Sequence, residues 1–295
     1  METVIRIEDL WKWYGTREAL KGIDLQVPGG QFISILGPNG AGKTTLIKCI
    51  TGLARCQMGA INIYGLDLRK NLREIKGRMG IVHQENNLDV YLNVMENLYM
   101  YGYMLDIDKN KLERKIPETL HFMGIKESLW FEKVENLSGG TKRKLMIARA
   151  LLNDPEILIM DEPTTGLDPS IRRLLWDRII SLKEKKITLI LTTHYMEEAH
   201  YISDRVVIMH SGRIIEDGKP DELIERYLPP FAVELSPPVE FNQEYKSIRS
   251  GDTIIIYTQK PEMITSRIEG RGLRKVSVRK TNLEDVFLLL TGNRL

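Results

Sequence analysis

The segment GPNGAGKT, residues 37–44, restricts the possible folds of this chain more than any other feature. It fits the phosphate-loop pattern G-x-x-x-x-G-K-[ST] at every position. The apolar run before it, GGQFISILG, predicts a buried strand, and KTTLIKCITGL after it predicts a helix that ends at Gly52. Between a strand and a helix, backbone N–H groups and the helix N-terminus attract phosphate oxygens. The segment therefore predicts an α/β fold with a nucleoside triphosphate site.

Two side chains of this loop carry its chemistry. We expect Lys43 to bridge the β- and γ-phosphates and the Thr44 hydroxyl to ligate Mg²⁺. Lys43 has no apolar neighbours in the sequence, so we expect it to have no structural role. An ordinary glycine-rich turn would need neither the lysine nor the hydroxyl. The predicted nucleotide-binding residues of the loop are Gly37, Pro38, Asn39, Gly40, Ala41, Gly42, Lys43, Thr44 and Thr45.

The segment EILIMDE places two carboxylates directly after four apolar residues. The apolar run predicts a buried strand, and the carboxylates emerge at its end. We expect Asp161 to hold the magnesium through water and Glu162 to orient or deprotonate an attacking water. Because PTTG follows, an acidic pair at a helix N-terminus is the alternative interpretation.

An aromatic cluster, WKWYG, lies upstream of the phosphate loop. In a strand, Trp11 and Trp13 would share one face and Tyr14 would point to the other. Tyr14 could stack on adenine, an attraction of about 1 kcal/mol. The alternative is that it packs against the edge of the core.

Strand-like and helical segments alternate along most of the chain. Continuous apolar strands between helices predict a mostly parallel sheet covered on both faces. The alternating segment ETVIRIEDLWKWYG predicts an antiparallel edge strand. Residues 91–150 are predicted to be mostly helical, with breaks near Asp106 and Pro117.

The composition changes at YLPPFAVELSPPVEF, which contains Pro229, Pro230, Pro237 and Pro238 and predicts a linker or boundary. Beyond it, DTIIIYT and KVSVRK predict strands, and NLEDVFLLLTG predicts a short helix capped by Asn or Thr. Six basic residues between Arg267 and Lys280 suggest attraction to an acidic membrane surface or partner. A solvated charged surface is the alternative.

The bulk properties exclude several classes of protein. The formal net charge is +2, so nothing calls for a nucleic-acid partner, and we expect none. The chain does not open on a secretory signal, and its apolar runs fall far short of the ~20 residues of a membrane helix. Any work at a membrane would then need another polypeptide to supply the membrane segments.

Four segments together resemble the ATP-binding cassette (ABC) ATPases: GPNGAGKTTL, LSGG, ILIMDEPTTGLDP and LTTH, in that order and spacing. The resemblance covers about residues 3–227. It implies a P-loop NTPase cassette with a mostly parallel core sheet, an antiparallel β edge and a helical signature subdomain at about 88–150. Residues 1–227 would form the cassette and residues 228–295 a small C-terminal α/β domain.

In that family two cassettes meet head to tail, and the signature loop of one covers the γ-phosphate held by the other. The resemblance therefore implies that Ser138, Gly139 and Gly140 bind a nucleotide of the partner cassette. Ser138 would offer a hydroxyl and Gly140 a backbone N–H at the start of a helix. Taken alone, LSGG would indicate only a capped helix start.

The remaining family motifs match residue by residue. Gln84 resembles the glutamine that senses magnesium and the attacking water, in a segment that usually touches the transmembrane partner. His194 resembles the switch histidine that contacts the γ-phosphate, although alone it would indicate an ordinary strand-end histidine. Gly166, Leu167 and Asp168 resemble the loop that crosses the dimer interface. The resemblance thus assigns catalysis to Glu162, His194 and Gln84, and the metal to Thr44, Gln84 and Asp161.

One departure from the importer pattern indicates which ABC subfamily the chain resembles. Thr141, followed by KRK, stands where many importer cassettes have glutamine. With the ending TNLEDVFLLLTG, this form resembles the exporter cassettes that serve ABC-2 permeases. The resemblance implies an ATPase that uses ATP and Mg²⁺ and pairs with a second cassette, for which we expect a homodimer. It would lie on the cytoplasmic face of the membrane, attached only through a transmembrane permease.

A different class remains as the alternative: a soluble ABC ATPase that acts as an ATP-gated clamp on ribosomes or chromosomes. Ribosome-associated relatives generally carry two cassettes in one chain, and this chain has one phosphate loop. DNA-repair relatives contain a long coiled coil, whereas residues 45–136 lack sustained heptads. A small-molecule kinase would not need LSGG or DEPTTGLD. The sequence therefore favours the transporter ATPase.

Overall fold

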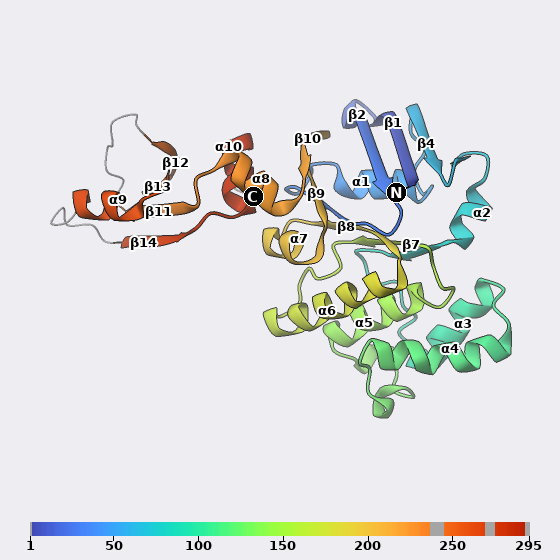
Figure 1. Ribbon diagram of the computed structural model, residues 1–295. Coiled ribbons are helices and arrows are strands. Elements are labelled where there is room, and N and C mark those ends of the chain that lie inside the picture. The colour runs from blue at the N-terminus through green and yellow to red at the C-terminus, as the bar shows by residue number, and fades with distance from the viewer. Residues whose placement is uncertain (1, 237–244, 269–274, 293–295) are drawn as a thin grey trace. The chain divides into compact units, whose positions relative to one another are not determined.

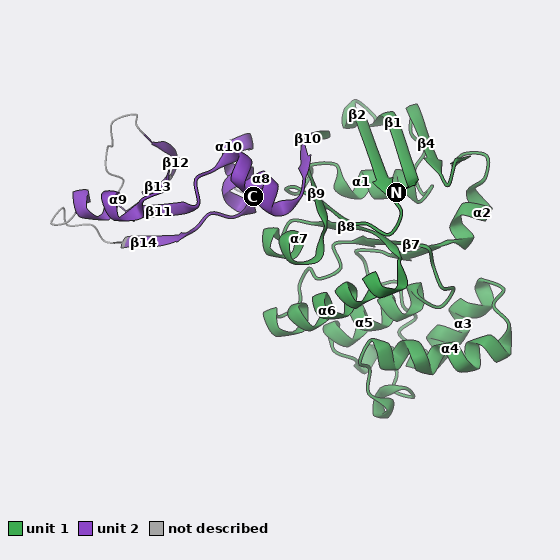
Figure 2. Cartoon of the chain, in the orientation of Figure 1, with its two compact units in different colours: residues 1–214 green, residues 215–295 purple. Residues whose placement is uncertain are grey.

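The computed structural model in Figure 1 describes residues 2–236, 245–268 and 275–292. They form two compact units, residues 1–214 and 215–295, which are coloured separately in Figure 2. Helix α8 (Pro220–Tyr227) packs against α10 (Leu283–Thr291). The second unit therefore starts before the predicted domain boundary at residue 228. Among the described residues, no helix is both long and apolar enough to span a membrane.

A six-stranded sheet contains the core of the first unit, in the order β10-β9-β3-β8-β7-β6. Neighbouring strands from β9 to β6 run parallel, as the alternation of strands and helices predicts. The strands β3, β7 and β8 are buried along their whole length. The bounds are β3 Phe32–Leu36, β6 Met79–Val82, β7 Ile157–Asp161, β8 Thr188–Thr193, β9 Arg205–His210 and β10 Arg213–Gly218.

Both faces of this sheet are covered, because successive residues of a strand point in opposite directions. In β7, Ile157 and Ile159 pack in a cluster with α1 (Lys43–Ile50) and the N-terminal antiparallel sheet. Leu158 and Met160 pack in a second cluster with the helices of the other face. These are α3 Val94–Met104, α4 Lys109–Phe122, α5 Gly139–Ala150 and α6 Pro169–Ser181. Figure 1 shows α1 on one side of the sheet and α5 and α6 on the other.

Short helices complete the first unit: α2 Leu72–Gly77, α7 Met196–Ile202, and the 3₁₀ turns η1 Glu127–Leu129, η2 Val134–Asn136 and η3 Leu182–Lys185. The predicted helix break near Asp106 is confirmed, since Asp106 follows α3 with a φ of 57°. The predicted break at Pro117 is wrong, because Pro117 lies inside α4. Buried Leu112, Ile116 and Leu120 hold that helix on the core despite the missing N–H.

The N-terminal segment forms an antiparallel sheet in the order β2-β1-β4-β5. The predicted edge strand is therefore wrong in one respect, because β1 pairs with β2 on one side and with β4 on the other. Its alternation still holds, since one face of β1 is buried. Alternation reports which face is buried and carries no information on how many neighbours a strand has. The bounds are β1 Thr3–Tyr14, β2 Arg17–Pro28, β4 Met58–Ile63 and β5 Leu66–Asp67.

The second unit contains an antiparallel sheet in the order β12-β13-β11-β14. Its elements are β11 Phe231–Ser236, β12 Lys246–Ser250, β13 Thr253–Thr258, β14 Lys275–Lys280, α9 Pro261–Ile268 and α10. Residues 231–236 lie inside the predicted linker, and that part of the prediction is wrong. Buried Ala232, Val233 and Leu235 make this segment an inner strand. Pro237 and Pro238 lie outside the described residues.

An ionic network around the buried Asp285 fastens α10 to this sheet. Arg279 donates to both oxygens of Asp285 (2.6 and 2.8 Å) and to Glu234 Oε1 (2.8 Å). The Tyr257 hydroxyl donates to Asp285 Oδ1 at 3.1 Å. The bond to Asp285 raises the pKa of Arg279, while burial and the same carboxylate raise the pKa of Tyr257. As predicted, an asparagine caps α10, namely Asn282.

Replacement of Arg279 should loosen α10. Arg279→Met leaves Asp285, which is fully buried, without its cation. We expect the opening free energy of α10, measured by native-state hydrogen exchange, to fall by about 3 kcal/mol. Arg249→Met, at an exposed position of β12, is the control and should change it by less than about 0.5 kcal/mol. Equal effects of the two substitutions would show that the network does not hold α10.

Candidate nucleotide site

Four strand ends meet at one edge of the six-stranded sheet. Strand β3 runs into the loop 37–42, β7 ends at Asp161, β8 ends just before His194, and β6 leads to Gln84. Because these strands are parallel and adjacent, their carboxyl ends lie along the same edge. The fold therefore brings the predicted loop, carboxylates, histidine and glutamine together.

The loop 37–42 is so closely packed that two of its glycines have no room for a Cβ. A Cβ on Gly37 would lie 2.3 Å from the Met209 carbonyl oxygen, and one on Gly42 would lie 2.7 Å from the Ala19 carbonyl oxygen. Gly42 also has a φ of 106°, which other residues rarely adopt. It is the N-cap of α1, so the loop delivers bare backbone to the helix N-terminus.

Lys43 is buried and bonded within this loop. Its Nζ donates to the carbonyl oxygens of Gly37 (2.8 Å) and Pro38 (3.2 Å) and lies 3.3 Å from Glu162 Oε1. The expectation that Lys43 has no structural role is therefore wrong. The loop carbonyls and the Glu162 carboxylate hold its side chain, and a lack of apolar neighbours in the sequence gives no information on such polar contacts. These contacts keep a positive charge inside the loop that the motif assigns to phosphate.

Asp161 provides oxygen donors of the kind that magnesium prefers. The Asp161 side chain is buried, and its Oδ1 accepts hydrogen bonds from Thr44 Oγ1 (3.2 Å) and Thr192 Oγ1 (2.5 Å). A carboxylate beside a hydroxyl is a hard oxygen set, which fits Mg²⁺. Gln84, the third predicted ligand, contacts Glu162 instead, with its Nε2 3.4 Å from Glu162 Oε2.

Glu162 is the point at which the strand ends converge. Besides Lys43 and Gln84, its carboxylate accepts from Thr165 Oγ1 (3.1 Å) and lies 3.3 Å from His194 Nδ1. Its backbone has a φ of 46°, a left-handed conformation that costs about 1–2 kcal/mol outside glycine. Hydrogen bonds from its N–H to Thr192 offset the energetic cost of this conformation. The buried carboxylate is thus held among a cation, an amide, a hydroxyl and an imidazole.

A pocket of about 490 Å³ opens beside these groups. Its lining combines loop residues with Gln84 and Glu162, and also includes Tyr14, Arg17 and Ala19. Arg17 and Ala19 were missed in the sequence. Arg17 pairs with Tyr14 at the turn between β1 and β2, so a correct hairpin prediction would have found it. The full lining is Tyr14, Arg17, Ala19, Asn39, Gly40, Gly42, Lys43, Thr44, Thr45, Gln84 and Glu162.

Tyr14 lines this pocket with 48% of its surface exposed. Lys12 Nζ lies 4.8 Å from the centre of its ring. Trp11 and Trp13 stack on each other, with ring centres 5.7 Å apart, and so share a face as expected. The exposure of Tyr14 favours a ring available for stacking over one packed against the core.

The signature residues Ser138, Gly139 and Gly140 do not belong to the lining of this pocket. Ser138 is the N-cap of α5 and accepts a hydrogen bond from the Thr141 N–H at 3.2 Å. A Cβ on Gly140 would lie 2.8 Å from Ile171 Cγ2, so packing on α6 explains that glycine. A Cβ on Gly139 would meet nothing within 4 Å. No intrachain contact among the described residues therefore requires glycine at 139.

Two arginines of α5 hold the segment around Gln84, and sequence reasoning did not single them out. Arg143 donates to the carbonyl oxygens of His83 (2.9 Å) and Gln84 (3.0 Å). Arg149 donates to the carbonyl and side-chain oxygens of Asn87. Burial lowers the pKa of both arginines. Helix α5, which starts at the signature, thus holds residues 83–87, the segment whose Gln84 contacts Glu162.

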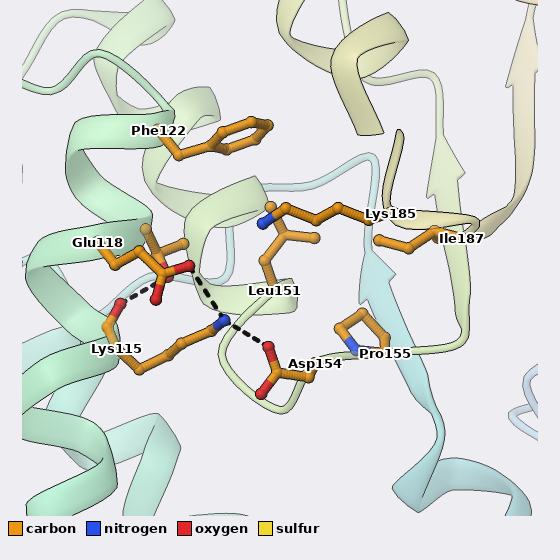
Figure 3. Close-up of a pocket in the computed structure, with 9 residues that line it drawn as sticks. Lys115, Glu118, Phe122, Leu151, Asp154, Pro155, Lys185 and Ile187 are labelled. Carbon is orange, nitrogen blue, oxygen red and sulfur yellow. Dashed lines mark hydrogen bonds and ion pairs between the residues drawn. The ribbon is translucent and has the colours of Figure 1, made fainter. Parts of the chain in front are cut away.

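A second pocket, shown in Figure 3, differs in chemistry. It measures about 230 Å³ and lies between α4 and the segments that precede β7 and β8. Figure 3 shows Glu118 and Asp154 directed at Lys115, and both form ion pairs with it. Burial lowers the pKa of Lys115, but Asp154 and Glu118 together outweigh burial, so the pKa is raised. Because its acids neutralise this lysine, the pocket is less suited to phosphate than the loop.

Comparison with known proteins agrees with this geometry. Residues 20–165 match the ABC transporter family, and residues 243–292 match the C-terminal domain of the nodulation factor export protein NodI. The chain is 36% identical over 307 residues to the Nod factor export ATP-binding protein I of Cupriavidus metallidurans, covering 100% of this chain and 99% of the relative. It is 39% identical over 299 residues to the protein of that name from Burkholderia orbicola, covering 99% and 98%.

Two solved structures each resemble about three quarters of the chain. The dimeric structure of MJ0796, a bacterial ABC transporter cassette, has a TM-score of 0.68 and 27% identity, and covers 73% of this chain and 98% of its own. The cbiO1 structure from Clostridium perfringens, part of the cbiONQ transporter complex, has a TM-score of 0.69 and 29% identity, covering 76% and 91%.

The packing of the loop yields a matched test. Gly42→Ala adds a Cβ against the Ala19 carbonyl oxygen and strains a φ of 106°. We expect it to weaken nucleotide binding at least tenfold, measured by calorimetry, because strain of about 1.4 kcal/mol or more opposes the binding conformation. Gly139→Ala, which has open space around it, should leave binding to the single chain unchanged. Equal affinities for the two variants would refute this explanation of Gly42.

Proposed function

Because the chain belongs to the ABC transporter ATPases, we propose that its nucleotide pocket is one half of a composite ATP site that two cassettes complete together. The chain is the ATPase subunit of an ABC exporter. The observation that carries the proposed site is the position of Glu162. A single buried carboxylate lies next to the phosphate-loop lysine, the glutamine after β6 and the histidine after β8.

We assign proton abstraction from the attacking water to Glu162. A carboxylate can take this proton if it is held in a fixed orientation within hydrogen-bond reach of the water. Thr165 and Gln84 donate to one carboxylate oxygen and Lys43 lies beside the other, which fixes the group. Lys43 and the N-terminus of α1 neutralise phosphate charge. His194 contacts the γ-phosphate beside Glu162.

Asp161 and Thr44 would hold the magnesium ion, with Gln84 close by. When bound, Mg²⁺ neutralises the charge that develops on the phosphate oxygens. Tyr14 stacks on the adenine at the open side of the pocket, which its exposed ring supports.

The second half of each site is the signature of another copy of the chain, arranged head to tail. Ser138 and Gly139 lie away from the lining of their own pocket, and Gly139 has open space where a Cβ would be. A bare helix N-terminus with that opening suits phosphate oxygens brought by a partner. The solved MJ0796 cassette is likewise described as dimeric.

The membrane partner is a permease that docks on the helical region. Exposed apolar side chains occur on α3 and on the residues just before and after it: Val90, Tyr91, Met100, Tyr103, Met104 and Leu105. Tyr91 is 76% exposed and Met104 75% exposed. We take these side chains, which belong to one helix and its two flanking segments, as the docking surface for the permease. Through this contact the protein works on the cytoplasmic face of the membrane, and the permease selects the cargo.

The soluble-clamp alternative is not favoured. The similarity to export ATP-binding proteins extends over almost the whole chain, including the C-terminal residues 243–292. The relatives are named for Nod factor export, and we extend to this chain the export direction of that name.

Substitution of Glu162 tests the proposed chemistry. Glu162→Gln keeps the size of the side chain and removes the proton acceptor. We expect ATP hydrolysis to fall at least about 100-fold, the lower end of the range for loss of a general base. ATP binding should persist, and an ATP-bound dimer should accumulate on gel filtration.

Glu156→Gln, an exposed residue before β7, is the control and should hydrolyse ATP at the normal rate. Hydrolysis by Glu162→Gln at the rate of the unmodified protein would rule out Glu162 as the base.

A further inference from the structure

Two segments that leave the site are connected to each other by side-chain contacts. From Glu162 the chain enters the loop 163–168, and from His194 it passes through Tyr195 into α7. The first turns of α6 lie between them and carry Arg172. Neither Arg172 nor Tyr195 lines the nucleotide pocket. Their contacts nevertheless connect the loop to the histidine.

The connection is a continuous series of contacts. Arg172 Nη2 donates to the Leu167 carbonyl oxygen at 3.4 Å. The Arg172 guanidinium lies 4.0 Å from the centre of the Tyr195 ring. The Tyr195 ring centre is 4.2 Å from that of His194. His194 Nδ1 is in turn 3.3 Å from Glu162 Oε2. The Leu167 carbonyl oxygen is therefore linked to the imidazole through the Arg172 guanidinium and the tilted Tyr195 ring.

A buried carboxylate forms a second connection between the two segments. Glu198 on α7 is fully buried, and its Oε1 accepts from Thr164 Oγ1 (2.7 Å) and from Trp176 Nε1 (2.8 Å). Burial raises the pKa of Glu198, and hydrogen bonds from Thr193, Thr164 and Trp176 oppose that effect. Thr164 belongs to the loop, and Thr193 immediately precedes His194. The loop and α6 are thus tied to a residue of α7, the helix that follows His194.

The few contacts of Arg172 allow its guanidinium to move with the loop 163–168. Among the described residues the Arg172 guanidinium forms no ion pair, and its buried Nε makes no hydrogen bond. One long hydrogen bond and a ring contact position it. An arginine locked by a bidentate carboxylate would hold its place whatever the loop did.

We propose that Arg172 and Tyr195 are positioning residues that transmit the position of the loop 163–168 to His194. The inference rests on the proposed function, in which this loop crosses to the second cassette. In the single chain His194 Nδ1 already lies 3.3 Å from Glu162 Oε2. Closure of two cassettes would then hold the imidazole at this position through the loop. Hydrolysis would depend on dimer closure through this pair, in addition to the signature contact.

The chain contains its own matched control one residue further along α6. Arg173 lies over the Tyr201 ring at 4.2 Å and 3.8 Å from Glu197. This pair has the same chemistry and joins the same two helices, α6 and α7. In the described part of the chain, neither Arg173 nor Tyr201 forms a hydrogen bond, ion pair or ring contact with the loop 163–168 or with His194.

The first test compares ATPase kinetics of the full chain. Arg172→Ala and Tyr195→Leu should lower kcat at least tenfold with the KM for ATP within about twofold, because binding groups are untouched. Tyr195→Phe keeps the ring and should retain most of the activity. Arg173→Ala and Tyr201→Leu should stay within about twofold of the unmodified protein. Equal rates for Arg172→Ala and Arg173→Ala would overturn the proposal.

The second test observes His194 directly and does not depend on turnover. The chain has five histidines, so selective imidazole labelling gives few NMR signals, and His194→Ala identifies the one of interest. With ATP in the Glu162→Gln background, Arg172→Ala should shift or broaden that signal, and Arg173→Ala should not. An unchanged His194 signal in Arg172→Ala would overturn the proposal even if activity fell.

The two levels of the account fail separately. If the unmodified chain does not hydrolyse ATP, or Glu162→Gln accumulates no ATP-bound dimer, the proposed function fails. If both of those hold while Arg172 and Arg173 variants behave alike, only the positioning role fails.

Discussion

The parallel pairing of β3, β8, β7 and β6 is the constraint on which the site depends. Adjacent parallel strands bring their carboxyl ends to one edge, so residues distant in the sequence lie within a few ångströms. Lys43 and Glu162 are 3.3 Å apart for this reason, and so are Glu162 and His194. The sheet in turn depends on burial of both faces, which β7 achieves by alternating between two apolar clusters. A polar residue facing either cluster would disturb the strand that ends at the two carboxylates.

Charge and strain are concentrated at this edge. Asp161, Glu162 and Lys43 are buried together, and such groups are costly unless they are paired. Thr44, Thr192 and Thr165 supply hydroxyls to the carboxylates, and the loop carbonyls receive the lysine. Glu162 also keeps a left-handed backbone, which the surrounding hydrogen bonds oppose. The charged groups around Glu162 are therefore paired before any ligand enters the site, and such an arrangement favours electrostatic stabilisation of phosphoryl transfer.

Much of the site could be predicted because its chemistry depends on contiguous residues. The loop 37–44 and the carboxylates after β7 need fixed spacing along the chain, and the sequence displays it directly. Arg17, Arg143 and Arg172 could not be found in this way. Each acts through a contact across the fold, and an arginine on a helix or turn gives no local signal of its partner. The break assigned to Pro117 failed for a similar reason, since the packing of α4 on the core outweighs a local preference.

The central claim is that the signature of one cassette serves the pocket of another, and complementation between two inactive variants tests it most directly. Lys43→Ala disables the phosphate loop and Ser138→Arg disables the signature. In a mixed dimer with sites formed in trans, one site carries both defects and the other carries none. The account predicts that mixing restores ATPase activity, up to one working site in each heterodimer. No recovery, with heterodimers shown to form by pull-down of differently tagged chains, would contradict it.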